Sequence, residues 1–84
     1  MFEVDNRMGL IEPVLLNNGF IETNNLNFTN GNCEIEVDLE NEIYNLYYKD
    51  INKVKFMVTS DNLNLYWLFG FLSAHDLVSR NFKL

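Results

Sequence analysis

Apolar and polar residues alternate through the middle of the chain in the pattern of half-buried β-strands. From Cys33 to Glu40 the odd positions are apolar and the even positions are acidic. Side chains of an extended strand point alternately to opposite faces, so the odd positions share one face and the even positions share the other. The pattern predicts a strand with one buried face and one acidic face.

Turn signals surround this strand. Asn30-Gly31 favours a two-residue type I′ turn, in which both central positions need positive φ. A second turn fits at Glu40-Asn41, and a third fits at Asp50-Ile51-Asn52 with Asn52 in the left-handed conformation. Each turn sets the register of the two strands that it joins.

Counting outward from these turns brings apolar residues opposite one another. The expected pairs include Phe28 with Cys33, Ile35 with Leu46, and Leu46 with Phe56. The prediction is a four-stranded antiparallel meander with one apolar face. That face carries Leu26, Phe28, Cys33, Ile35, Val37, Tyr44, Leu46, Tyr48, Val54, Phe56 and Val58.

Helical periodicity appears before the sheet. Apolar residues recur at helical spacing from Leu10 onward, and Gly19 supplies a left-handed stop. Pro13 has no amide hydrogen and fits only where that donor would be free anyway. We therefore expect this helix to begin near Leu10 or Glu12.

A longer helix is expected after the sheet. Ser60 or Asp61 serves as its N-cap, and it runs from about Asn62 to Ser79. Asp76 and Arg80 stand four residues apart, a favourable spacing for an ion pair on a helix. The predicted fold class is α+β, a single domain over residues 1–84 in the order α-β-β-β-β-α, with the short and the long helix on one face of the sheet.

The second helix has two apolar stripes. The first stripe, which we expect to cover the sheet, consists of Leu63, Tyr66, Trp67, Gly70, Phe71, Ala74, Leu77 and Val78. The second stripe consists of Leu65, Leu68, Phe69 and Leu72. A helix that is apolar on two faces needs two partners. Either the first helix packs on the second stripe, or that stripe is a face for an oligomer or for another protein.

The composition describes a small folded domain with a local acidic charge. The chain has 84 residues, 48% of them hydrophobic, and a formal net charge of -6 at pH 7. This hydrophobic content excludes a disordered chain. Five of the 12 acidic residues stand between positions 34 and 42, so the other seven nearly balance the six basic residues.

Cysteine usage and the absence of targeting signals predict a cytoplasmic protein. The single cysteine, Cys33, falls on the apolar face of its strand, so we expect a buried thiol. The first residues show no secretory signal pattern, and the longest apolar run, Leu65 to Phe69, is too short to cross a bilayer. We expect no association with a membrane.

Catalytic chemistry has little support. His75 is the only histidine, and Ser73 and Asp76 stand at spacings that diverge in direction on a helix. The chain has no Cys/His metal spacing and no glycine-rich phosphate loop after a strand. We predict that the protein is not an enzyme, that it uses no cofactor and no metal, and that His75 is a polar helix residue.

The five carboxylates form an acid ladder, which consists of Glu34, Glu36, Asp38, Glu40 and Glu42. It is a solvated sheet face, a docking surface for a basic partner, or a site for a hard cation. Carboxylates on one strand face stand roughly 7 Å apart, too far to chelate one ion without help. The lysines are gathered elsewhere, at Lys53 and Lys55, so charge is segregated. Such a surface repels nucleic acid and attracts the basic groove of a protein that binds nucleic acid.

Several of these features resemble the small phage-encoded anti-defence proteins, including anti-CRISPR inhibitors. They are the short chain, the segregated acid ladder, fourteen asparagines among 84 residues and the lack of catalytic motifs. The resemblance concerns overall character and transfers no individual residue. It implies a protein-binding inhibitor in the host cytoplasm, which occupies the basic nucleic-acid channel of an RNA-guided nuclease or disturbs guide binding. The alternative is a virion or host assembly module that oligomerises through Leu65, Leu68, Phe69 and Leu72.

Overall fold

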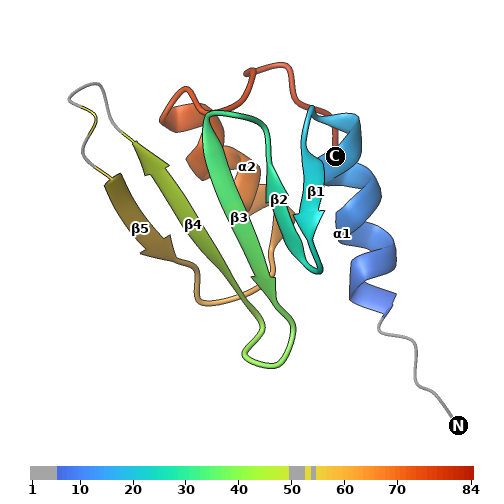
Figure 1. The fold of residues 1–84 in the computed structure, drawn as a ribbon. Coiled ribbons are helices and arrows are strands. Elements are labelled where there is room, and N and C mark those ends of the chain that lie inside the picture. Colours follow the sequence, from blue (N-terminus) through green and yellow to red (C-terminus); the bar gives the residue numbers. More distant parts are fainter. Residues whose placement is uncertain (1–5, 50–52, 54) are drawn as a thin grey trace, which may run out of the picture.

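A computed structural model describes residues 6–49, 53 and 55–84 of the chain. Within them the elements are α1 (Asn6–Asn17), β1 (Ile21–Asn24), β2 (Asn27–Thr29), β3 (Cys33–Asp38), β4 (Ile43–Lys49), β5 (Lys55–Thr59) and α2 (Leu65–Ala74). The strands form one antiparallel sheet in sequence order, with α2 behind its central strands and α1 beside β1 (Figure 1). The predicted α+β class with an antiparallel sheet is confirmed, but the sheet has five strands, not four.

The additional strand is β1, which pairs with β2 at the edge of the sheet. All of its residues are exposed, so no buried alternation marks it in the sequence. Ile21 lies opposite Thr29 on the outer face, and Glu22 lies opposite Phe28 on the inner face. The Glu22 carboxylate accepts a hydrogen bond from the Leu26 amide at 3.3 Å, which ties it to the turn before β2.

The register of two hairpins differs from the prediction by two residues. Thr29 lies opposite Glu34 instead of Asn32, and Gly31, not Asn30, has a positive φ, at 91°. The prediction of a type I′ turn at Asn30-Gly31 is therefore wrong. Asn30 instead closes a wider loop, because its Oδ1 accepts hydrogen bonds from the amides of Asn32 (2.9 Å) and Cys33 (3.1 Å).

The hairpin of β3 and β4 has the predicted register, whereas the hairpin of β4 and β5 does not. Ile35 lies opposite Leu46, as predicted for the hairpin of β3 and β4. Leu46 lies opposite Val58 instead of Phe56, which shifts β5 by two residues. The predicted turn at positions 50–52 and the core position Val54 lie outside the described residues. Because both shifts are even, every strand residue keeps its predicted face.

The start of α1 also differs from the prediction. The helix begins at Asn6 and continues through Pro13, which is exposed to solvent. Water can therefore hydrate the carbonyl that the missing amide hydrogen leaves without a helical donor. The end of α1 is as expected, because Gly19 adopts φ 90°. The Phe20 amide then donates to the Leu15 carbonyl at 3.0 Å, and both side chains are buried.

The second helix is shorter than predicted at both ends. Ser60 is not its N-cap, because the Ser60 hydroxyl accepts a hydrogen bond from the Tyr44 amide at 2.7 Å. Asp61 also precedes the helix, and Asn64 caps it by accepting from the Trp67 amide at 3.1 Å. These polar contacts keep residues 60–64 outside the helix.

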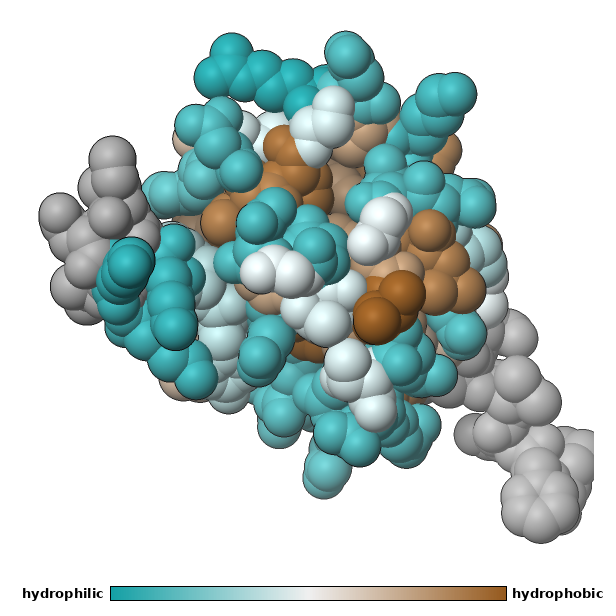
Figure 2. Space-filling model, turned by 45° about the horizontal axis from the view of Figure 1, so that its top comes forward, coloured by the Kyte–Doolittle hydropathy of each residue, from teal (hydrophilic) through white to brown (hydrophobic). Residues whose placement is uncertain are grey.

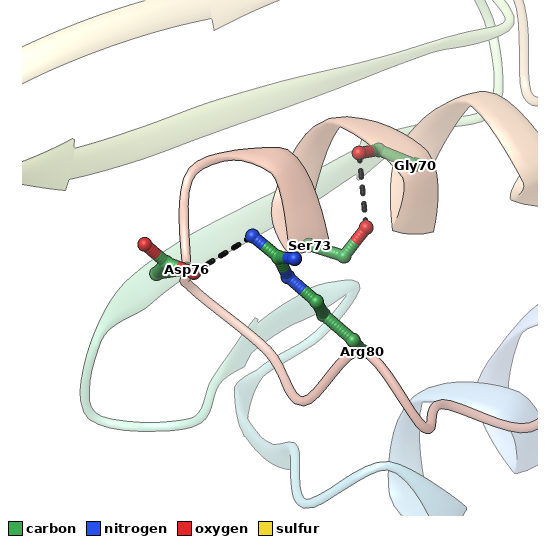
Figure 3. A network of polar contacts seen from close by, with 4 residues as sticks. All are labelled: Gly70, Ser73, Asp76 and Arg80. Carbon is green, nitrogen blue, oxygen red and sulfur yellow. Dashed lines mark hydrogen bonds and ion pairs between the residues drawn. The ribbon is translucent and has the colours of Figure 1, made fainter.

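The C-terminal end of α2 repeats the motif that ends α1. Asp76 takes the left-handed conformation, at φ 57°, and the Leu77 amide donates to the Leu72 carbonyl at 2.8 Å. The chain therefore leaves the helix after Ala74, before Ser79. Arg80 reaches back to the Asp76 carboxylate at 4.0 Å, so this pair bridges the loop after the helix (Figure 3).

The core shows that α2 packs mainly through its second stripe. Leu68, Phe69 and Leu72 of the second stripe are fully buried, whereas Tyr66 of the first stripe is 78% exposed. The prediction that the first stripe covers the sheet holds only in part, because Leu77 is buried and the Phe71 ring meets Tyr48 of β4 at 5.8 Å between centroids. The core consists of Ile11, Leu15, Phe20, Phe28, Cys33, Ile35, Val37, Tyr44, Leu46, Leu68, Phe69, Leu72 and Leu77.

Among the predicted core residues that the structure describes, only Phe56 is exposed, with 41% of its surface accessible. The predicted burial of Ile35, Val37 and Leu46 is confirmed, as is that of Cys33. Phe56 lies on edge strand β5, beyond the part of the sheet that α2 covers (Figure 1). Its ring stacks on Tyr48 at 5.6 Å between centroids, and solvent reaches the rest of it.

Candidate interaction surface

Neither helix covers the outer face of the sheet (Figure 1). Strand pairing arranges its side chains in rows, because residues directly opposite each other share a face. One row crosses all five strands and consists of Ile21, Thr29, Glu34, Tyr47 and Met57. In Figure 2, tilted so that the top of Figure 1 comes forward, apolar side chains form patches between polar ones.

The next row contains a chain of side-chain hydrogen bonds across three strands. Asn45 Nδ2 donates to Glu36 Oε1 at 2.8 Å, and Thr59 Oγ1 donates to Asn45 Oδ1 at 2.9 Å. Asn45 is buried between its neighbours although it belongs to the outer face. Glu36 is thus held in one orientation by an amide on the adjacent strand.

Asp38 is also fixed by a local amide, at the turn between β3 and β4. Its Oδ1 accepts from the Asn41 backbone amide at 3.0 Å, and its Oδ2 accepts from Asn41 Nδ2 at 2.9 Å. The side-chain hydrogen bond first, and then the backbone one, lower the pKa of Asp38 below its ordinary value. The carboxylate therefore stays ionised under all mildly acidic conditions.

The acid ladder is continuous along one side of the molecule. Glu34, Glu36 and Asp38 lie on the outer face of β3, as the alternation predicts, and Glu34 is exposed. Glu40 and Glu42 are exposed in the loop that follows, where Glu42 adopts φ 58°. The negative charge is thus strongest toward this loop.

Lysines lie closer to the ladder than the sequence suggested. Lys49 on β4 lies directly opposite Lys55 on β5, and both line a hollow of about 510 Å³ together with Glu34 and Tyr47. Lys55 Nζ sits 5.5 Å from the centre of the Tyr47 ring. Lys55 lies two strands from the ladder, whereas Lys49 lies on the strand next to it. The outer face has an acidic end at the 39–42 loop and a basic end at Lys49 and Lys55.

Groups with catalytic potential are dispersed. Burial first, and the nearby Glu34 charge second, raise the pKa of the Cys33 thiol to about 12, so it is a poor nucleophile at neutral pH. His75 is exposed and its ring packs 4.3 Å from that of Phe71. Within the described residues, no group of three or more His, Cys, Asp or Glu side chains is arranged to hold a metal ion.

The residues suggested for an oligomer or partner face lie in the core. Leu68, Phe69 and Leu72 are fully buried and Leu65 is partly buried against the same cluster. The second stripe is thus buried within the chain, in the same core cluster as Leu15 of α1.

Two residues of the surface escaped the sequence analysis. They are Asn45 and Lys49, neither of which stands out in the sequence as a candidate for the surface. The register of β3 and β4 places Asn45 opposite Glu36. The predicted pairing of Ile35 with Leu46 gives the same register. The amide contact could therefore have been anticipated from that pairing.

Comparison with protein-family models, with curated proteins and with solved structures gives no match in any of the three. Among the described residues, no helix is both long enough and apolar enough to span a membrane.

Proposed function

We propose that this protein is a non-catalytic inhibitor that binds a basic protein surface through its acid ladder. Its target class is the RNA-guided nucleases, whose basic channels hold nucleic acid, as the resemblance to anti-defence proteins implies. In this proposal the carboxylates take the place of phosphates in such a channel.

The observation that carries the proposal is the placement of the ladder on an uncovered sheet face. Glu36 and Asp38 are each oriented by an amide, at 2.8 and 2.9 Å. A carboxylate held in one orientation loses less conformational freedom when it meets a cation, so preorganisation favours binding. Hydrogen bonding by neutral amides leaves the negative charge unneutralised and available to a basic partner.

The direct test measures cleavage of target DNA by a panel of guide-loaded RNA-guided nucleases after incubation with the protein. We expect inhibition of at least one nuclease at low salt and weaker inhibition at high salt, because screening slows association between opposite charges. Absence of inhibition and of binding across the panel would overturn the nuclease assignment.

A matched pair of variants tests the ladder itself. Glu34→Gln, Glu36→Gln and Asp38→Asn together remove three charges from the outer face. Glu3→Gln, Asp5→Asn and Glu12→Gln remove the same charge from positions that precede β1 in the sequence. We expect only the first set to slow association and to flatten its salt dependence. Equal effects of both sets would assign the interaction to net charge and not to the ladder.

A further inference from the structure

Strand β5 combines a sheet edge with exposed apolar side chains. Met57 is 58% exposed on the outer face, and Phe56 is exposed on the inner face. Among the described strands only β4 pairs with β5, and neither helix lies behind it (Figure 1). Exposed sheet edges are usually protected against pairing with another chain by charge, proline or a bulge. Lys55 is the one charged residue within this strand.

The backbone of β5 points its free hydrogen-bonding groups away from the molecule at alternate residues. The Ser60 amide donates to the carbonyl of Tyr44, which lies opposite it in the register of β4 and β5. Hydrogen-bonded and non-hydrogen-bonded pairs alternate along an antiparallel ladder, so Val58 and Phe56 also face β4. The amides and carbonyls of Lys55, Met57 and Thr59 therefore point outward.

The sequence around β5 is complementary to itself when it is reversed. An antiparallel copy centred on Met57 places Lys55 opposite Thr59 and Phe56 opposite Val58, so apolar meets apolar on the inner face. Lys53 and Asp61, both exposed, stand two residues before and two residues after the strand. The basic start of one copy thus meets the acidic end of the other.

We propose that two copies of this chain associate by antiparallel pairing of β5 with β5, with the two-fold axis at Met57. The Lys53 and Asp61 charges select a second copy over an unrelated strand, because each end of the edge complements the other end. The occupant of this edge is therefore the same chain. The two sheets become one continuous sheet.

The pairing also covers an aromatic cluster beneath the edge. Trp67 stacks on Phe71 at 5.5 Å, Phe71 meets Tyr48 at 5.8 Å, and Tyr48 stacks on Phe56. This cluster extends from α2 to β5 on the inner face, which both copies present on the same side of the joined sheet. The contact lies at the small end of interface sizes, so the dimer dissociates on dilution.

Sedimentation equilibrium over a range of protein concentrations tests the proposal. We expect the wild-type chain to dimerise and the Met57→Lys variant to remain monomeric, because two lysines would then lie directly opposite each other at the axis. The matched control is Ile21→Lys, on the other sheet edge, where the side chain is 62% exposed. It should fold and dimerise as the wild type does.

Charge reversal tests the orientation of the two strands. Lys53→Asp and Asp61→Lys should each weaken dimerisation by about tenfold, since each creates like-charged contacts at both ends of the interface. The double variant should restore it, because opposite charges again meet. Failure of the double variant to recover, with both single variants impaired and folded, would overturn the antiparallel register.

Hydrogen exchange gives the most direct result. The amides of Met57 and Thr59 should gain protection as the concentration rises, and the protection of the Val58 amide, which faces β4, should change less. A chain that stays monomeric at millimolar concentration overturns the proposal. So does a dimer in which the Met57 amide exchanges freely. A monomer whose β5 edge binds only an unrelated peptide strand would reassign the edge to another partner.

Discussion

The two faces of the sheet are stabilised in different ways. On the inner face, residues such as Ile35 and Leu46 are fully buried in one apolar core. On the outer face, Asn45 is equally central in the sheet, yet it is held by hydrogen bonds to Glu36 and Thr59. Apolar burial is tolerant of partner identity, whereas the outer face depends on specific pairs. The two faces should therefore respond differently to truncation, to added charge and to pH.

Truncation of the inner face should have the largest effect. Leu46→Ala removes a fully buried side chain from the central part of the sheet. We expect it to lower the free energy of unfolding by about 2–5 kcal/mol, through lost burial and a residual cavity. Urea denaturation measures this, with Tyr47→Ala on the outer face of the same strand as control. Similar losses for both variants would erase the distinction between the faces.

Added charge should reveal the specificity of the outer face. Asn45→Asp replaces the amide donor with a carboxylate beside Glu36 Oε1. We expect a loss of about 1–3 kcal/mol at neutral pH, because a hydrogen bond becomes a repulsion at a buried position. Acidification should recover part of the loss, and Asn45→Gln provides the neutral control. A variant as stable as the wild type at neutral pH would contradict this role of Asn45.

Alkaline pH should lower the folding stability through buried groups of the inner face. Burial raises the pKa of Cys33 from 9.0 to about 12, so the folded state holds this proton more tightly than the unfolded state. Stability is fully present below pH 9 and falls as the pH rises toward 12. The Tyr44 pKa is raised by burial as well and adds to the slope. Cys33→Ala should have a shallower alkaline decline in denaturation midpoints, and an unchanged slope would contradict the buried thiol.

Acid pH should act on the outer face, with the smallest effect of the four. Hydrogen bonds from Asn41 lower the pKa of Asp38 from 3.8 in the folded state. The resulting stability is present above that value and is lost as the pH falls through the folded pKa. Asp38→Asn should remove this part of the acid dependence in denaturation curves recorded between neutral and strongly acidic pH. Asp76→Asn, outside the sheet, serves as its control.

The assignment of residues to faces followed from the sequence because alternation survives an error in register. Both misplaced hairpins are shifted by two residues, so Phe28 and Val58 keep their predicted side. The register itself depends on the loops. Asn30 accepts hydrogen bonds from two loop amides, a contact that competes with a tight turn and that no local pattern announces.

The C-terminal ends of α1 and α2 also differ in how well the sequence predicts them. Gly19 ends α1, and its role was predicted because glycine adopts positive φ without a steric cost. Asp76 ends α2 with the same backbone motif, but an aspartate inside an apolar periodic segment gives no comparable signal. Burial of Leu77 beside Leu72 favours that ending, and such burial exists only in the folded chain.

The sequence by itself determined the fold class, the acidic face of β3 and the inner face of the sheet, because these follow from alternation and composition. Tertiary structure alone decided which stripe of α2 is buried, since both stripes are apolar enough to cover a sheet. It also decided that β1 joins the edge and that Phe56 stays exposed. The burial of the stripe and the exposure of Phe56 depend on how far α2 covers the strands, and the position of β1 depends on its pairing with β2. These are properties of packing between segments and not of any local pattern.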